Sequence, residues 1–340
     1  MKTHVNIPVF IPHLGCPNQC VFCNQRTISG VGKFDPNSVI PIIEEAIASS
    51  PDARERELAF FGGSFTGIEP ELMETLLNIG NRYLKQGRIT SIRCSTRPDY
   101  INEAVLYKLA QFGVRTVELG LQSCDGGVLD LCKRGHTFAD EKRACELLVK
   151  NGFIVGGQMM IGLPGSTRDL ERQTAQKIVE LGCTEARIYP TVVFRDTELY
   201  DLTVNGTYKP LDISDAILRS ADAFSVLVNS GVKVLRVGLC DSENLHSDTT
   251  YYAGPNHPAM GELVENEYYY RLISDKLGNS YTKGMLLTVF APVGHTSKVI
   301  GQCKANKSRI LRERGLADFK VRESDKLHGY SLLLKIEERI

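Results

Sequence analysis

The sequence predicts an α/β protein, built as a partial (β/α)6 TIM-like barrel followed by a small C-terminal α/β subdomain. Short runs of β-branched and aromatic residues alternate with longer segments whose apolar residues lie three and four positions apart. This is the pattern of strands alternating with amphipathic helices. Such alternation predicts a parallel sheet with right-handed crossover helices. Glycines after several helical segments fit the left-handed residue that often ends a helix.

Six strand–helix pairs account for the first 240 residues. The predicted strands are 5–11, 58–61, 91–95, 115–119, 154–161 and 186–190. The predicted helices are 39–48, 70–84, 102–112, 139–151, 167–181 and 214–229. Six pairs fit a partial barrel better than a closed eightfold one. In parallel barrels the site residues lie at the carboxyl ends of the strands.

The strand–helix pattern weakens after residue 240. An irregular segment over 241–261 contains the breakers Gly254-Pro255 and His257-Pro258. A second set of elements follows, with helices at 262–276 and 304–314 and strands at 285–290, 318–321 and 330–336. We therefore expect a barrel domain over residues 1–240 and an α/β subdomain over 241–340 that could cap the barrel.

Composition sets limits on the class of protein. The 340 residues contain 40 Lys and Arg against 40 Asp and Glu, so no overall charge favours nucleic acid or membrane. We see no signal peptide and no apolar run that would span a bilayer, so we expect a cytoplasmic protein with no membrane partner. Of ten cysteines, only Cys16, Cys20 and Cys23 cluster. In a reducing compartment such a cluster indicates metal binding or catalysis rather than disulfides.

The cysteine cluster has the spacing C-x3-C-x2-C in the loop after the first strand. Soft thiolates suit zinc or the iron of iron–sulfur clusters. Zinc would need a fourth ligand, and electron-transfer clusters generally use four cysteines. With only three cysteine ligands, one iron of a four-iron cluster would keep an open coordination position, and an open position indicates catalysis.

This motif, with Phe22 before its third cysteine, resembles that of the radical S-adenosylmethionine (SAM) superfamily. The resemblance implies a [4Fe–4S] cluster on Cys16, Cys20 and Cys23, with SAM bound at the open iron. It implies reductive cleavage of SAM to a 5′-deoxyadenosyl radical that abstracts hydrogen from a substrate, with a flavodoxin- or ferredoxin-like electron donor. A non-catalytic iron–sulfur or zinc-binding scaffold is the alternative.

Polar or glycine-rich segments follow the other strands, as this hypothesis requires. Gly62 and Gly63 resemble the family's Gly-Gly motif, which binds the SAM amino group, with Ser64 where Glu is frequent. Ser95, at the end of the third strand, could hydrogen-bond the SAM ribose. Glu118 lies inside an apolar strand and needs a polar partner, either a ligand or Arg97.

Three further positions resemble oxygen-independent coproporphyrinogen dehydrogenases. Gln122, Arg134 and Gln158 match residues that hold the methionine and ribose parts of SAM in that group, although Gln158 stands where Asp is usual. An Arg suits the carboxylate by its bidentate geometry. Cys124 is a weak candidate for a hydrogen-atom donor, because a lone cysteine is more often a small buried hydrophobe.

Segments 95–99, 134–137 and 188–200 resemble the radical SAM half of the Elongator catalytic subunit, over roughly residues 5–240. The last hundred residues do not resemble its acetyltransferase. The substrate therefore stays open between RNA, such as tRNA, and a tetrapyrrole or other small molecule. Asn24, where haem-pathway enzymes have an extra cysteine, counts against tetrapyrroles. The basic helix 304–314 could contact RNA phosphates or be an ordinary solvated face.

Overall fold

The computed structural model describes residues 4–11, 15–16, 20–23, 34–239, 249–278 and 283–338. Asn24 and residues 241–248 of the segment expected to be irregular lie outside these ranges. A seven-stranded sheet of order β1-β2-β3-β4-β5-β6-β8 organises the structure, and every neighbouring pair in it is parallel. Its strands are β1 (His4–Ile11), β2 (Glu55–Gly62), β3 (Ser91–Thr96), β4 (Val114–Gln122), β5 (Ile154–Ile161), β6 (Glu185–Pro190) and β8 (Lys233–Val237).

The predicted α/β partial barrel is confirmed, with one strand more than expected. All six predicted strands form. The seventh, β8, was not predicted, because it is only five residues long and Lys233 and Arg236 interrupt its apolar run.

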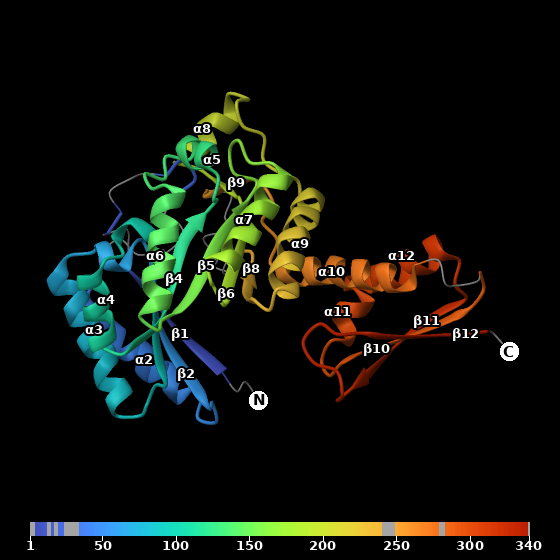
Figure 1. The fold of residues 1–340 in the computed structure, drawn as a ribbon, viewed down its shortest axis with the longest axis horizontal. Coiled ribbons are helices and arrows are strands. Elements are labelled where there is room, and N and C mark those ends of the chain that lie inside the picture. Colours follow the sequence, from blue (N-terminus) through green and yellow to red (C-terminus); the bar gives the residue numbers. More distant parts are fainter. Residues whose placement is uncertain are drawn as a thin grey trace.

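Helices cover the outer face of this sheet (Figure 1). They are α2 (Val39–Ala48), α3 (Pro70–Lys85), α4 (Glu103–Gln111), α6 (Phe138–Lys150), α7 (Arg168–Glu180) and α9 (Ile213–Asn229). Each turns its apolar stripe to the sheet. In α3, for example, Met73, Leu76, Leu77 and Tyr83 are buried at spacings of about one turn. Two short helices, α5 (Gly126–Leu131) and α8 (Glu198–Val204), and a two-stranded sheet of β7 (Val193–Phe194) and β9 (Tyr251–Ala253) complete this part.

The sheet curls so that side chains of distant strands meet in its lumen. Adjacent strands lie about 4.8 Å apart, so a flat sheet would hold β3 and β6 about 14 Å apart. Arg93 of β3 nevertheless lies 3.1 Å from a carboxylate oxygen of Glu185 on β6. Arg187 of β6 also lies over the ring of Phe61 on β2, 5.2 Å from its centroid. The curled sheet is therefore half of a barrel, closed at its centre by side chains.

The predicted C-terminal helices and strands all form, and one short helix over 296–300 was not predicted. The C-terminal elements are α10 (Met260–Leu277), β10 (Leu286–Pro292), α11 (Thr296–Ile300), α12 (Ala305–Arg314), β11 (Asp318–Ser324) and β12 (Leu333–Glu337). A three-stranded sheet of order β11-β10-β12 pairs β10 parallel to β11 and antiparallel to β12. We call residues 283–338 the C-terminal arm, because Figure 1 shows them projecting from the barrel beyond α10.

Helix α10 belongs to two hydrophobic cores. Its first half packs Val264 and Tyr268 into the barrel core, and its second half packs Tyr269 and Ile273 into the core of the arm. The division of the chain at residue 240 stays a prediction. Over the described residues, no helix combines the length and apolar character needed to cross a membrane.

Candidate functional site

The cysteine loop lies at the carboxyl end of β1, in backbone contact with the loop that follows β2. A Cβ atom at Gly15 would lie 2.2 Å from the carbonyl oxygen of Ser64. A Cβ atom at Gly67 would lie 2.4 Å from the carbonyl oxygen of Gly15. These separations are shorter than any van der Waals contact. Only glycine therefore allows the two loops to approach this closely.

Two backbone hydrogen bonds attach the other side of the cysteine loop. The Val21 N–H donates to the carbonyl of Cys132, just after α5, at 3.2 Å. The Val21 carbonyl accepts from the Leu199 N–H, in α8, at 2.8 Å. Phe22 packs against the apolar cluster that includes Val21, Val128 and Leu199. Three parts of the chain thus hold the loop in place.

Two guanidinium groups lie beside the thiols. Arg134 donates from Nη1 to Cys20 Sγ at 3.1 Å and from Nη2 to the Gly120 carbonyl at 2.6 Å. Arg97 makes a bidentate pair with Asp99, with both N–O distances at 2.9 Å. Burial raises the pKa of the Cys16 thiol, and the charges of Arg97 and Arg134 act against that rise. The arginines therefore favour thiolates, the form that binds metal.

The loop after β2 is joined to the end of β3 by hydroxyl groups. Gly62 has φ +125°, and a Cβ there would lie 1.9 Å from the Ile11 carbonyl oxygen, so β1 itself requires this glycine. Gly63 follows it at the start of the loop. Buried Ser64 shares a 2.7 Å hydrogen bond with Thr96 and accepts from the Arg97 N–H at 3.2 Å. The Ser64 side chain thus holds two strand ends together.

Gln122 ends β4 in a left-handed conformation, with φ +70°. Such backbone is uncommon for a residue with a side chain and clusters at functional sites. Within the described residues, its buried Oε1 has no hydrogen-bond partner, and neither does buried Nη1 of Arg97. An acceptor and a donor left open at the same edge of the sheet suit a polar ligand that carries both kinds of group.

The Glu118 carboxylate is hydrogen-bonded by other side chains of the protein. It accepts hydrogen bonds from Arg93 at 2.7 Å and from Arg187 at 2.6 and 3.0 Å. The Gln158 amide also donates to it, at 2.8 Å. Burial alone would raise the pKa of Glu118, but Arg187, Gln158 and Arg93 together lower it. The sequence left either a ligand or Arg97 as the partner of Glu118. Arg97 does not pair with it, and Arg93 and Arg187 do.

These two arginines were not singled out from the sequence, although each is a charged residue inside a short apolar strand. That signal could have found them, since a buried cation requires a partner. The Arg93 Nε also donates to Glu57 at 2.6 Å. Ser95, buried and in register with Glu118, lies on the same side of the sheet.

Cys124 lies between β4 and α5, and its contacts come from α6 and α7. Its N–H donates to Thr174 Oγ1 at 3.2 Å. Burial, followed by the neighbouring Glu141, raises the pKa of its thiol far above the ordinary range. Glu141 lies 3.0 Å from His136 Nε2, and both side chains are fully buried. Burial raises the pKa of Glu141 to about 8, and burial with Arg134 lowers that of His136 to about 3, which makes a neutral pair.

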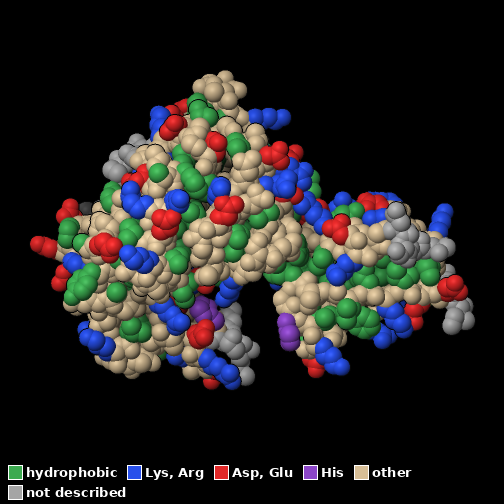
Figure 2. Space-filling view, in the orientation of Figure 1, with side chains coloured by type: hydrophobic (Ala, Val, Ile, Leu, Met, Phe, Trp, Pro, Cys, Tyr) green, Lys and Arg blue, Asp and Glu red, His purple; other side chains and the backbone are tan. Residues whose placement is uncertain are grey.

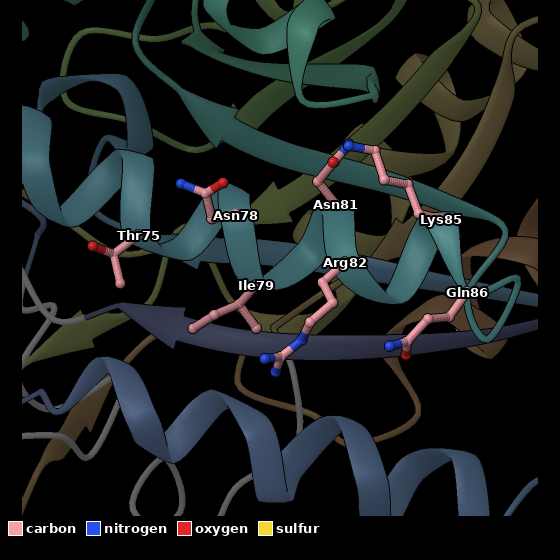
Figure 3. Close-up of a pocket in the computed structure, with 7 residues that line it drawn as sticks. All are labelled: Thr75, Asn78, Ile79, Asn81, Arg82, Lys85 and Gln86. Atoms are coloured by element: carbon pink, nitrogen blue, oxygen red, sulfur yellow. The ribbon is translucent and has the colours of Figure 1, made fainter.

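Three hollows among the described residues lie away from the cysteines, and one of them, of about 470 Å³, lies between β8 and the start of α10. Another, of about 650 Å³, is lined by residues of α3 and the turn after it on the outer helical layer (Figure 3). It holds none of the groups discussed above. A third, of about 410 Å³, opens at the amino ends of the strands, where its rim includes His4, Arg115 and Lys233. The ion pairs around Glu57 and Arg93 separate it from the carboxyl ends.

Comparison with known proteins identifies the class. The model of the radical SAM superfamily matches residues 10–178, and that of the radical SAM C-terminal domain matches residues 183–270. Together they cover most of the chain. The protein belongs to the radical SAM superfamily and is an enzyme.

Several individual proteins are similar. The tRNA uridine(34) acetyltransferase of Methanocaldococcus jannaschii is 32% identical over 45% of this chain and 29% of its own length. Protein YhcC of Escherichia coli is 25% identical over 61% of this chain and 70% of its own. The solved structure of Methanocaldococcus infernus Elp3 superposes with a TM-score of 0.63 and 25% identity, over 81% of this chain and 64% of that one. The chain thus spans less than a third of the tRNA acetyltransferase.

The chemistry of the donor set suits an iron–sulfur cluster. Cys16, Cys20 and Cys23 are all free thiols. Among the described residues, no three metal-binding side chains converge on one point. Three thiols with two cations beside them would suit such a cluster.

Proposed function

We propose that this enzyme cleaves SAM reductively at a [4Fe–4S] cluster held by Cys16, Cys20 and Cys23. When bound, such a cluster supplies the electron that breaks the S–C5′ bond of SAM, giving methionine and a 5′-deoxyadenosyl radical that abstracts hydrogen from the substrate. A flavodoxin- or ferredoxin-like protein would deliver the electron. One observation carries the proposal: Arg134 contacts Cys20 at the same sheet edge where Gln122 and Arg97 have open polar atoms.

The protein supplies charge, shape and orientation. Arg97 and Arg134 keep positive charge beside the thiolates, which lowers the cost of holding three anions together. Gly62, Gly63, Ser95 and Gln122 lie at the carboxyl ends of β2, β3 and β4, where they would surround SAM. Phe22 packs the cysteine loop onto its apolar support.

Gln158 gains a defined orientation from Glu118. Because a carboxylate only accepts hydrogen bonds, the Gln158 NH₂ must face Glu118. The Gln158 carbonyl oxygen is then the atom available to accept from a ribose hydroxyl. Glu118 would thus support the ligand site through Gln158, and this arrangement accounts for a Gln where an Asp is usual.

Anaerobic SAM cleavage tests the proposal. The protein is reconstituted with iron and sulfide, reduced with dithionite and given SAM, and 5′-deoxyadenosine is quantified beside iron content and the cluster absorption spectrum. The triple variant Cys16→Ala/Cys20→Ala/Cys23→Ala should lose both cluster and product, whereas Cys303→Ala, an exposed cysteine of the arm, should keep both. A reducible cluster that yields no 5′-deoxyadenosine would favour the non-catalytic scaffold.

An RNA substrate is the second part of the proposal. Two similar archaeal proteins carry the name tRNA uridine(34) acetyltransferase, and the match covers 29% and 25% of their lengths. We therefore propose RNA as the substrate in preference to a tetrapyrrole or other small molecule, and we do not propose acetyl transfer. Salt-dependent binding of tRNA transcripts would support RNA, and its absence would favour a small-molecule substrate.

A further inference from the structure

The C-terminal arm concentrates positive charge in a chain whose total charge is zero. Residues 283–338 hold eleven Lys and Arg against six Asp and Glu. The remainder of the chain must therefore be net negative. Figure 2 shows Lys and Arg side chains on the visible side of the arm and a notch between the arm and the lower barrel. A basic region on an otherwise acidic protein indicates a polyanionic partner for that region.

One face of the arm's sheet is covered and the other is open. Leu287 and Val289 of β10 and Phe319 of β11 are fully buried in the arm's core, with α10 and α12. Because side chains alternate along a strand, the residues between them point the opposite way. No helix of the described arm covers that second side (Figure 1).

Strand register places the open-face residues in three rows. In each row a β10 residue lies between its partners on β12 and β11. The rows are Leu333–Phe290–Arg322, Lys335–Thr288–Lys320 and Glu337–Leu286–Asp318. The face therefore carries Phe290 on its central strand, three cations in the two rows at that end and its two acids at the other end.

The cations of this face are accessible and close together. Lys320 and Lys335 are each 60% exposed, and they pair with Asp318 at 3.9 Å and with Glu337 at 2.7 Å. Exposed pairs of this kind contribute little, so both lysines can exchange partners. The hydrogen bond from Lys335, followed by the charges of Arg322 and Lys320, lowers the pKa of Glu337. All three cations therefore act on one small area.

The basic helix α12, which the sequence put forward for RNA, is mostly engaged inside the arm. Lys307 pairs with Asp318 at 3.1 Å. Arg309 pairs with Glu267 at 2.9 Å and lies 3.5 Å from the ring centre of Tyr270. These contacts hold α12 against α10 and β11. The open sheet face is consequently the better candidate.

We propose that the open face of the β11-β10-β12 sheet docks the RNA substrate. Lys320, Arg322 and Lys335 would contact phosphates, and Phe290 would stack on an unpaired base. Cations that follow the backbone, combined with aromatic rings under the bases, are the general means of holding single-stranded nucleic acid. This inference rests on the RNA substrate proposed above, and it assigns the docking surface to residues far from the cysteine loop.

Binding of an unmodified tRNA transcript to the full reconstituted chain tests this surface. Fluorescence anisotropy is measured over a series of salt concentrations for wild type and for Lys320→Gln/Arg322→Gln/Lys335→Gln. Loss of three phosphate contacts should weaken binding at least tenfold and reduce the slope of log K against log salt by about 2–3. Phe290→Ala should weaken binding about tenfold and leave that slope unchanged.

A matched triple variant on the barrel controls for total charge. Lys142→Gln/Arg143→Gln/Arg172→Gln removes three cations that are 51–62% exposed on α6 and α7, and it should bind RNA like wild type. Equal losses in both triple variants would overturn the docking surface. Wild type that binds no RNA would overturn both the surface and the RNA substrate, while SAM cleavage, measured on the same samples, would still stand or fall separately.

Size-exclusion chromatography and thermal melting complete the test. The sheet-face variants should elute and melt like wild type. A change from dimer to monomer would show that the face joins two copies of the chain and would overturn RNA docking. If the triple variant fails to fold, Phe290→Ala and the single variant Arg322→Gln carry the same prediction, with a slope reduced by about 1 for the latter.

Discussion

Two buried glutamates on neighbouring elements, Glu118 in β4 and Glu141 in α6, differ in charge. Glu118 is 1% exposed and Glu141 is 0% exposed, so burial penalises the two carboxylates similarly. The pKa of Glu118 is nevertheless lowered, whereas that of Glu141 is raised to about 8. The lumen of the half-barrel thus holds an ionised carboxylate, and the layer between sheet and helices holds a protonated one.

The partners explain the difference. Glu118 accepts from two guanidiniums and an amide, which repay the cost of removing its charge from water. The partners of Glu141 are a neutral imidazole and a thiol, which cannot offset that cost. Burial alone therefore does not fix the charge state of a group in this fold. The lumen holds an ion network around Glu118, whereas the imidazole and thiol beside Glu141 carry no charge.

Removal of the ionised carboxylate should have the largest effect. Glu118→Ala leaves Arg93 and Arg187 short of a buried partner, so the free energy of unfolding should fall by about 3–5 kcal/mol. Glu141→Ala should cost less, about 1–3 kcal/mol, because it removes a neutral hydrogen-bonding group. Urea denaturation of both variants makes the measurement. Equal losses of unfolding free energy in the two variants would contradict the difference in charge between Glu118 and Glu141.

The protonated carboxylate should make stability depend on pH. The folded pKa of Glu141, about 8, lies above its unfolded value near 4.3, so the folded state holds an extra proton between them and loses stability as pH rises. His136, with a folded pKa of about 3, acts in the opposite direction up to about pH 6.5.

Of Glu141 and His136, only Glu141 still changes the stability with pH above pH 6.5. The free energy of unfolding should therefore fall by about 1–2 kcal/mol from pH 6.5 to pH 8 in wild type. Glu141→Gln, which cannot titrate, should show little change over this interval. The measurement is urea denaturation at both pH values, and the same fall in the variant would disprove the protonated state.

The smallest effect should come from Cys124. A hydrogen bond between its thiol and Glu141 lowers the pKa of that carboxyl somewhat. Cys124→Ala should therefore raise the pKa of Glu141 and displace the fall in stability to higher pH, by about half a pH unit. Cys303→Ala, in the exposed part of the arm, is the matched control and should leave the profile unchanged. A displacement to lower pH would contradict this geometry.

The sequence predicts those parts of the structure that neighbouring residues determine. Alternating apolar patterns identify six strands and their helices, and the three-cysteine motif marks the site within eight residues. The ion network could not be placed in this way, because Arg93 and Glu185 are 92 residues apart and meet only when the sheet curls. Strand β8 was missed for a related reason, since its polarity suits a lumen edge that only the folded sheet creates.

Site residues differ in the same respect. Gln122 and Arg134 could be selected by resemblance, but the left-handed backbone of Gln122 and the contact of Arg134 with Cys20 depend on the assembled strand ends. From the sequence, either a ligand or Arg97 was expected to pair with Glu118. In the structure Arg93 and Arg187 pair with Glu118, because they lie on the same face of the sheet.

Helix α10 has a consequence for whether this protein can be divided. Its adjacent residues Tyr268 and Tyr269 lie in different cores, and Tyr330 of the arm packs against both, with Phe224 of α9 at 5.3 Å between ring centres. A chain cut after α10 would expose Tyr269, Ile273 and Leu277 to water. The arm is therefore not a detachable module, and barrel and arm should melt in a single cooperative transition.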